Sequence, residues 1–337
     1  MSGKRSSKSG SRDNGDSLVV GIDLGGTHFQ VGVVDGNGVI VGRARGLTRA
    51  NGGGDEDGVV ERLVEGVREA CHQAGVLVGG EVRRIGIGAP SPIDSSFGVA
   101  LEAVNLGWKD YPLGVRMREE LGGEVRVTLD NDVNCAVWGE FVMGAARGFS
   151  SVLGLWIGTG IGGGFVFDGR LFHGARGTAG EIGRAVLYPD KRHGEWVYED
   201  WASRKSMVRR IGEAVARGER CVFSERFAGG EEGTVSSADI AQAVENHDET
   251  VSWIVRDSAR LTGIMAANAC TLLSLDGIVI GGGIAEEMGE VYAGWMRESF
   301  EEAVFPNALR GCAIVVTELK DNAGLLGAAL LARERLG

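Results

Sequence analysis

Cysteine motifs, long apolar runs and a leader are missing from this sequence. Its five cysteines are odd in number and far apart, without a Cys-x-x-Cys pair: Cys71, Cys135, Cys221, Cys270 and Cys312. Neither a disulfide framework nor a cysteine zinc site is therefore indicated. No stretch reaches the ~18 uncharged apolar residues that a membrane span needs, and the N-terminus lacks the apolar core of a signal peptide. These absences predict a cytoplasmic protein.

Positive charge is also in short supply, whereas glycine is abundant. The 337 residues include 35 Lys and Arg against 46 Asp and Glu, a net charge of -11. This balance argues against nucleic acid as a main partner. There are 57 glycines, against an average usage of about 7%. They cluster at turns after apolar runs and do not repeat with the period of collagen.

A carboxylate stands where a strand is expected to meet a helix. Asn131 and Asp132 follow the β-rich run 125–129, and residues 133–146 have the pattern of a helix. Backbone N–H groups and the helix dipole favour a carboxylate at such a helix start. Asp132 is therefore a candidate base.

A glycine-rich loop, 158–164, follows one helix length later. Its sequence GTGIGGG matches the dinucleotide pattern GxGxxG, which requires a helix directly after the glycines. Here an apolar run, 165–167, follows instead, so a strand–turn–strand hairpin is predicted. Its backbone could approach an anion closely; an ordinary hairpin is the alternative.

The same pattern occurs near the N-terminus. Asp23-Leu24-Gly25-Gly26-Thr27 separates the apolar runs 18–22 and 29–34. Two such hairpins suggest two related lobes that hold one polyphosphate. Asp23 could hold Mg²⁺, directly or through water, since hard cations take oxygen ligands. A turn-capping role is the alternative for Asp23.

Strands and helices alternate along the rest of the chain, which predicts an α/β fold. Residues 1–17 are polar and are expected to form a disordered tail. Asn105 and Trp108 suit a sugar, through hydroxyls and the ring face, although Trp108 could equally belong to the core. Glu181 lies among small residues on an expected loop.

Eight motifs resemble the ROK family of sugar kinases, repressors and open reading frames, in the order of that family. They are GIDLGGT (21–27), GIGAPSPID (86–94), NLGW (105–108), NDVN (131–134), GTGIGGG (158–164), GARGTAGEIG (174–183), GGG (281–283) and NAGLLGAA (322–329). The run NLGWKDYPL (105–113) is most similar to the glucokinases of the family.

The resemblance implies an actin-like (ribonuclease H-like), two-lobed ATPase fold with a cleft between the lobes. A small lobe would span 18–125, completed by the C-terminal helix 321–335, and a large lobe would span 126–320. Family kinases are commonly homodimers or homotetramers.

The resemblance also implies roles for individual residues. Asp132 would be the catalytic base. Residues facing the sugar would be Asn105, Asn131, Asp132, Glu181 and Glu199. Residues around ATP and Mg²⁺ would be Asp23, Gly25, Gly26, Thr27, Gly158, Thr159, Gly160, Gly162, Gly282 and Gly283.

The chain departs from the family pattern on the sugar side. Arg184 replaces a histidine, Ser91 replaces a glycine, and the family's cysteine-rich zinc motif is missing around 193–199. No zinc site is therefore expected. We expect Arg184 to pair with a nearby carboxylate (Glu181, Glu195, Glu199 or Asp200) and to hold 185–199; a solvent-facing Arg184 is the alternative.

The expected activity is transfer of the γ-phosphate of ATP to a hexose, with glucose as the acceptor and glucose 6-phosphate as the product. Mannose, fructose, an N-acetylhexosamine or a polyphosphate donor are alternatives. A non-catalytic sugar-binding regulator is a more distant one, because only about 17 polar residues precede the first motif, without room for a DNA-binding domain.

Overall fold

The computed structural model describes residues 18–49, 56–103, 105–191, 194–230 and 232–337. The expected tail, 1–17, and His193 lie outside the described residues. None of the described helices combines the length and the apolar character needed to cross a bilayer.

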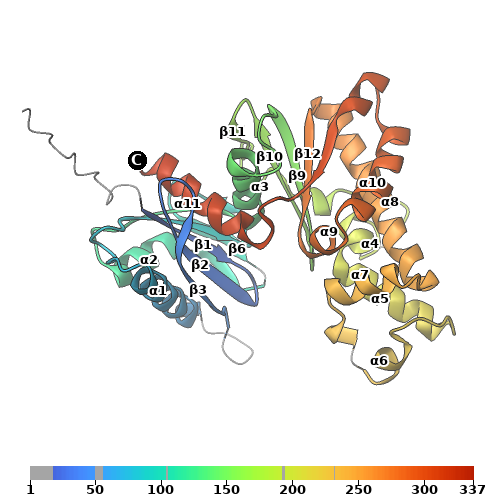
Figure 1. The fold of residues 1–337 in the computed structure, drawn as a ribbon, viewed down its shortest axis with the longest axis horizontal. Helices are drawn as coiled ribbons and strands as arrows, with labels where there is room; N and C mark the ends of the chain where they lie inside the picture. The colour runs from blue at the N-terminus through green and yellow to red at the C-terminus, as the bar shows by residue number, and fades with distance from the viewer. Residues whose placement is uncertain (1–17, 50–55, 104, 192–193, 231) are drawn as a thin grey trace, which may run out of the picture.

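The first sheet has five strands in the order β3-β2-β1-β4-β8. Their bounds are β1 (Val19–Leu24), β2 (His28–Val34), β3 (Ile40–Leu47), β4 (Arg84–Ala89) and β8 (Arg126–Asn131). The first three are antiparallel neighbours, and β4 and β8 continue the sheet parallel to β1. Apolar residues of α1 (Glu56–Gln73) and α2 (Leu113–Leu121) share one buried core with this sheet, and both helices lie on one side of it in Figure 1.

The second sheet repeats this arrangement in the order β11-β10-β9-β12-β13. Its strands are β9 (Ser151–Ile157), β10 (Ile161–Phe167), β11 (Arg170–Leu171), β12 (Gly277–Gly281) and β13 (Ala313–Val316). Here too an antiparallel hairpin is followed by two parallel strands. The repeat expected from the two glycine turns thus extends to whole sheets: β1 of the first sheet corresponds to β9 of the second, and β8 corresponds to β13.

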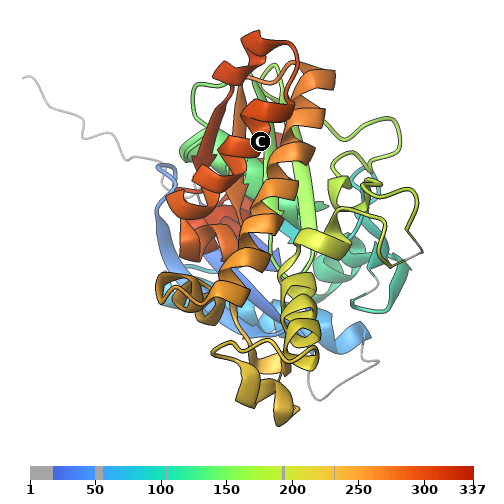
Figure 2. The same cartoon turned by 90° about the vertical axis from the view of Figure 1, so that its right-hand side faces the viewer.

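Helices gather on the outer face of the second sheet, which Figure 2 views from the helical side. Most of them share the largest core cluster with β9 and β12, whereas Ala202, in the first of them, belongs to a smaller cluster with Tyr198, Leu261 and Met265. These helices are α4 (Glu199–Ala202), α5 (Arg204–Ala216), α6 (Ser224–Ala228), α7 (Ser237–Glu245), α8 (Glu249–Leu273), α9 (Gly283–Met288) and α10 (Glu290–Ala303).

Two helices, α3 (Asp132–Met143) and α11 (Ala323–Arg335), lie between the sheets (Figure 1). Helix α3 directly follows β8, the last strand of the first sheet. Helix α11 follows the short turn after β13, the last strand of the second sheet. They touch through glycines: a Cβ on Gly139 would lie 2.6 Å from the Ala323 carbonyl oxygen, and one on Gly327 would collide with the Cys135 carbonyl. This close contact joins the two halves of the molecule.

A small third sheet, β5 (Ile93–Asp94), β6 (Val99–Ala103) and β7 (Trp108–Tyr111), completes the α/β fold. The first sheet includes residues 126–131, which the expected division assigned to the large lobe. Pairing of β8 with β4 therefore moves the end of the first half from residue 125 to Asn131. The division into two lobes itself stays a prediction.

Candidate functional site

Asp132 is the first residue of α3, directly after β8. Asn131 caps the helix: its side-chain oxygen accepts hydrogen bonds from the backbone N–H groups of Val133 (2.9 Å) and Asn134 (3.1 Å). The Asn131 Nδ2 donates to Asp132 Oδ1 at 2.9 Å, and the Val133 N–H donates to the same oxygen. The helix start thus holds the carboxylate in one orientation.

The surroundings of Asp132 raise the pKa of its carboxyl above the value that it has in water. Burial raises the pKa of Asp132 to about 6, and the negative charge of Glu181 adds to this, although hydrogen bonds from Val133 and Asn131 oppose it. A carboxylate with such a pKa is a stronger base than one at the ordinary value of ~3.9, and it is still ionised at neutral pH.

Asp130, two residues earlier, has the opposite character. It is 2% exposed and accepts from Asn134 Nδ2 (3.0 Å), His173 Nε2 (2.8 Å) and the Arg335 guanidinium. Burial raises the pKa of Asp130, but His173 and Arg335 outweigh it, so the pKa lies below its ordinary value. The sequence analysis did not identify this network, because His173 and Arg335 are distant in sequence and nothing in their spacing links them to Asp130.

The acidic residues expected to face the sugar come together around Asp132. Burial raises the pKa of Glu181, and the charge of Glu199 raises it further. Glu199 Oε2 accepts a hydrogen bond from the Ile161 N–H at 2.6 Å, directly after the glycine turn. A Cβ on Gly160 would lie 2.6 Å from the same oxygen. Glu199 is therefore fixed against the second glycine turn.

Asn105 lies beside the first glycine turn, since a Cβ on Gly26 would come within 3.3 Å of the Asn105 Cβ. Its neighbour Trp108 is 2% exposed and stacks on Tyr111 with ring centroids 4.5 Å apart. Trp108 thus belongs to the core, which decides between the two interpretations left open by the sequence.

Both glycine motifs form the predicted strand–turn–strand hairpins. In the first, the Gly25 N–H donates to the His28 carbonyl (2.9 Å), and Thr48 donates through its N–H to the Thr27 carbonyl. In the second, the Gly158 N–H donates to the Gly160 carbonyl at 3.0 Å. No helix follows Gly163, because β10 continues to Phe167. The dinucleotide pattern in this loop is therefore coincidental.

Gly162, like Gly163 and Gly164, belongs to the strand after the second turn and not to the turn itself. It lies within β10, paired with Trp156, and a Cβ there would come 2.5 Å from Val133 Cγ2. Its small size lets β10 pack against α3, beside Asp132. Packing thus supplies a reason for this glycine that is independent of any ligand.

Asp23 lies near the end of β1, and the Gly282–Gly283 turn directly follows β12. Burial raises the pKa of Asp23 to about 7, and the charges of Asp132 and Asp321 contribute. Gly282 has φ +81° and lies against Ile157, whereas a Cβ on Gly283 would lie 2.7 Å from Ser237 Oγ. The residues expected around a nucleotide therefore border both glycine hairpins.

Arg184 pairs only loosely. Its Nη1 lies 3.8 Å from Glu199 Oε1, and its side chain is 69% exposed. The segment around it is held by other bonds: Asp200 Oδ2 accepts from the N–H groups of Trp196 and Val197 (both 3.1 Å), and Trp201 Nε1 donates to the Glu195 carbonyl at 2.7 Å. The structure therefore gives little support to the expectation that Arg184 holds 185–199 in place.

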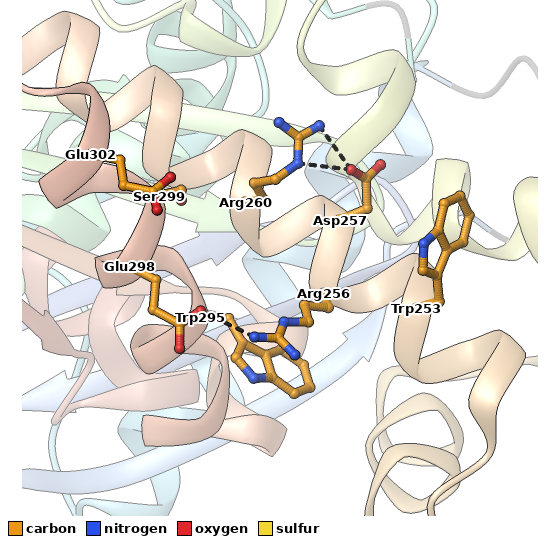
Figure 3. A pocket seen from close by; sticks show the side chains of 8 residues that line it. All are labelled: Trp253, Arg256, Asp257, Arg260, Trp295, Glu298, Ser299 and Glu302. Atoms are coloured by element: carbon orange, nitrogen blue, oxygen red, sulfur yellow. Dashed lines mark hydrogen bonds and ion pairs between the residues drawn. The ribbon is translucent and has the colours of Figure 1, made fainter.

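Within the described ranges, no three His, Cys, Asp or Glu side chains form a metal-binding group; the absence of zinc stays a prediction. A pocket between α8 and α10, shown in Figure 3, contains none of the expected residues. Its charges pair with one another, as in Arg256–Glu298 (3.2 Å) and Arg260–Asp257 (2.9 Å).

Comparison with known proteins identifies the family. The model of the ROK family matches residues 19–335. A glucokinase of Streptomyces coelicolor is 30% identical over 325 residues, 94% of this chain and 98% of the relative.

Two solved structures are similar to this chain over nearly its whole length. The crystal structure of a ROK family glucokinase from Streptomyces griseus, in complex with glucose and AMPPNP, has a TM-score of 0.79 and 29% identity, covering 94% of this chain and 99% of that one. The ROK hexokinase from Thermus thermophilus has a TM-score of 0.75 and 30% identity, covering 95% and 99%. The expected actin-like fold is confirmed. The chain belongs to the ROK family.

Proposed function

We propose that this protein is an ATP-dependent glucokinase that transfers the γ-phosphate of ATP to O6 of glucose. The observation that carries the proposal is the half-buried Asp132 carboxylate, oriented by Asn131 and with a pKa raised to about 6. It lies next to two glycine hairpins of the kind that approach phosphates. The glucokinase of S. griseus, which binds glucose and AMPPNP, supports the choice of substrates.

The reaction requires positioning and charge neutralisation. Glucose O6 attacks the γ-phosphorus, a new O–P bond forms, and the bond from the γ-phosphorus to the β–γ bridging oxygen breaks to release ADP. The O6 proton passes to Asp132, which is ionised at neutral pH and accepts it as the hydroxyl loses electron density. Asp132 is therefore the proposed general base.

Four further side chains would hold the sugar. Glu181 and Glu199 would accept charge-assisted hydrogen bonds from its hydroxyls, and Asn105 would add an amide from the first hairpin. The Asn131 Nδ2 donates to Asp132 Oδ1 at 2.9 Å and to the Ser91 carbonyl at 3.4 Å; a sugar hydroxyl would replace the longer contact, since the amide has two N–H donors. In this arrangement Asn131 both orients the base and contacts the substrate.

The two hairpins would hold the phosphates through backbone groups of Gly25, Gly26 and Thr27 and of Gly158, Thr159 and Gly160. Gly282 and Gly283 would border the adenosine, and Gly162 would keep β10 close to α3.

Asp23 would hold Mg²⁺, directly or through water. Burial raises its pKa, and the charges of Asp132 and Asp321 raise it further; none of the described cations pairs with Asp23, so its environment fits an added cation. Bound Mg²⁺ would neutralise phosphate charge.

A coupled assay over glucose, mannose, fructose and N-acetylhexosamines, with ATP or polyphosphate as donor, tests the proposal. The expected result is the highest kcat/KM with glucose and ATP. A clear preference for another sugar or for polyphosphate would correct the substrate. Glucose binding without turnover for any pair would instead indicate a non-catalytic regulator.

A further inference from the structure

Arg204 is a cation at the second glycine hairpin that the sequence analysis did not identify. It is the first residue of α5, and its backbone N–H donates to the Gly158 carbonyl at 2.9 Å. Its guanidinium reaches the tip of the hairpin, where Nη2 donates to Thr159 Oγ1 at 2.9 Å. Both ends of this residue are therefore tied to the same turn.

The second contact of the guanidinium leads toward the adenosine side. Nη1 donates to the Val235 carbonyl at 3.0 Å. Two residues further on, Ser237 Oγ lies 2.7 Å from the place that a Cβ on Gly283 would occupy. Arg204 thus spans the region between the proposed phosphate turn and the Gly282–Gly283 turn.

Arg204 differs from other arginines of this helical region because it has no carboxylate partner among the described residues. Arg256 and Arg260 in the pocket of Figure 3 each pair with a carboxylate, as do Arg209, Arg210, Arg217 and Arg226. Among the described residues, no carboxylate pairs with Arg204. A guanidinium has five N–H donors, and the two contacts above use neutral oxygens. The half-buried cation is therefore available to an anion at this turn.

We propose that Arg204 binds the phosphate chain of the nucleotide, from the α5 side of the second hairpin. The inference rests on the proposed function and adds a residue to it. When the bond between the γ-phosphorus and the bridging oxygen breaks, negative charge moves onto the β-phosphate of ADP. A fixed guanidinium at this place neutralises that charge, as planar bidentate donors do for phosphates.

Binding of ADP and of adenosine to the intact protein separates this role from a structural one. Isothermal titration is carried out on the wild type and on Arg204→Met, Arg204→Lys and Lys205→Met. The last variant removes an exposed charge from the next residue and serves as the matched control. Arg204→Met is expected to weaken ADP binding by about 10- to 100-fold, the usual effect of losing hydrogen bonds to a charged group.

Adenosine and glucose affinities should stay within about twofold in Arg204→Met, because neither ligand carries a phosphate. Arg204→Lys should recover part of the ADP affinity, and Lys205→Met should behave like the wild type. Equal weakening of ADP and adenosine would overturn the inference, since Arg204 would then act only through the loop at Val235. Unchanged ADP affinity would overturn it as well.

Steady-state kinetics on the same proteins distinguish this failure from failure of the proposed function. A wild type that phosphorylates glucose beside an Arg204→Met variant with unchanged ADP affinity refutes Arg204 alone. A wild type that neither binds ADP nor phosphorylates any sugar refutes the proposed function, and the role of Arg204 with it.

Discussion

His173 Nε2 and Asp130 Oδ2 lie 2.8 Å apart, and this contact ties two parts of the candidate site together. Asp130 is the penultimate residue of β8, the strand that leads into Asp132, whereas His173 lies near the start of the loop that carries Glu181. Asp130 is buried and is held in addition by Asn134 and Arg335. The contact therefore fixes the distance between the proposed base and a proposed sugar-binding carboxylate.

We expect His173→Phe to weaken sugar binding selectively. Loss of a hydrogen bond to a buried carboxylate costs about 1.5–3 kcal/mol, so the KM for glucose should rise about tenfold or more, with the KM for ATP within about twofold. Steady-state kinetics with each substrate varied in turn measures both.

Two further variants test the cause. His173→Gln keeps a side-chain donor and should restore most of the glucose KM. His72→Phe makes the same change on the exposed surface of α1 and should alter neither KM. Equal increases in both KM values for His173→Phe would show a general loss of structure instead of a local one.

The sequence predicted the elements of this site better than their connections. Local apolar patterns located α3 and both hairpins, since such patterns decide these elements. The motifs led to Asp132 and Glu181. The His173–Asp130 contact could not be predicted, because it depends on the meeting of segments distant in the chain. Trp108 remained open for the same reason: burial is a property of the folded chain.

Replacing the proposed base should remove turnover and keep the fold. Asp132→Asn retains an oxygen for the Val133 N–H but cannot accept the hydroxyl proton. Loss of a general base typically costs about 10²–10⁴-fold in rate, so kcat should fall by that factor while glucose still binds. Near-normal turnover in the purified variant, with an unchanged thermal midpoint, would rule out Asp132 as the base.

The raised pKa of Asp132 predicts an acid limb in the rate profile. The base must be ionised, and its pKa is about 6, so kcat/KM for glucose should be level above about pH 7 and fall toward a tenfold loss per unit well below pH 6. Saturating Mg²⁺ keeps Asp23, which titrates near pH 7 without a cation, from adding to this limb.

Unfolding does not explain such a loss. A carboxyl whose pKa is raised in the folded state binds its proton more tightly there than in the unfolded chain. Its contribution to stability is therefore full at low pH and is lost as the pH rises through about 6. Circular dichroism should show a folded protein at pH 5, and a flat rate profile from pH 5 to 8 would contradict the assignment.

Gly158 is the best position at which to test the phosphate role of the second hairpin. A Cβ on Gly160 would meet Glu199, which confuses sugar and phosphate effects, whereas a Cβ on Gly158 has only the Gly160 carbonyl within 4 Å, at 3.9 Å. We expect Gly158→Val to fold normally and to raise the KM for ATP at least about tenfold, since the side chain would occupy the space of the phosphates.

Gly123→Ala, at a position with nothing within 4 Å of a Cβ, is the control for added side-chain bulk. Unaltered ATP kinetics in Gly158→Val would reduce this hairpin to a structural turn.

The segment 185–199 provides the last prediction. The Arg184–Glu199 pair is long and exposed, and exposed ion pairs contribute about 0–1 kcal/mol. Asp200 instead accepts from two backbone N–H groups, those of Trp196 and Val197. We therefore expect Asp200→Ala to increase proteolytic cleavage within 185–199 about tenfold, because these two bonds oppose local opening.

Arg184→Ala should change that cleavage rate by less than about twofold, in keeping with the small value of an exposed pair. Glu199 follows Val197 closely in sequence and contacts the Ile161 N–H, so loosening at Asp200 should also raise the KM for glucose severalfold while the KM for ATP stays nearly constant. Limited proteolysis with mass spectrometry, run beside the kinetics, measures both effects. If Arg184→Ala opened the segment more than Asp200→Ala, the exposed arginine and not the turn that Asp200 holds would be its main support.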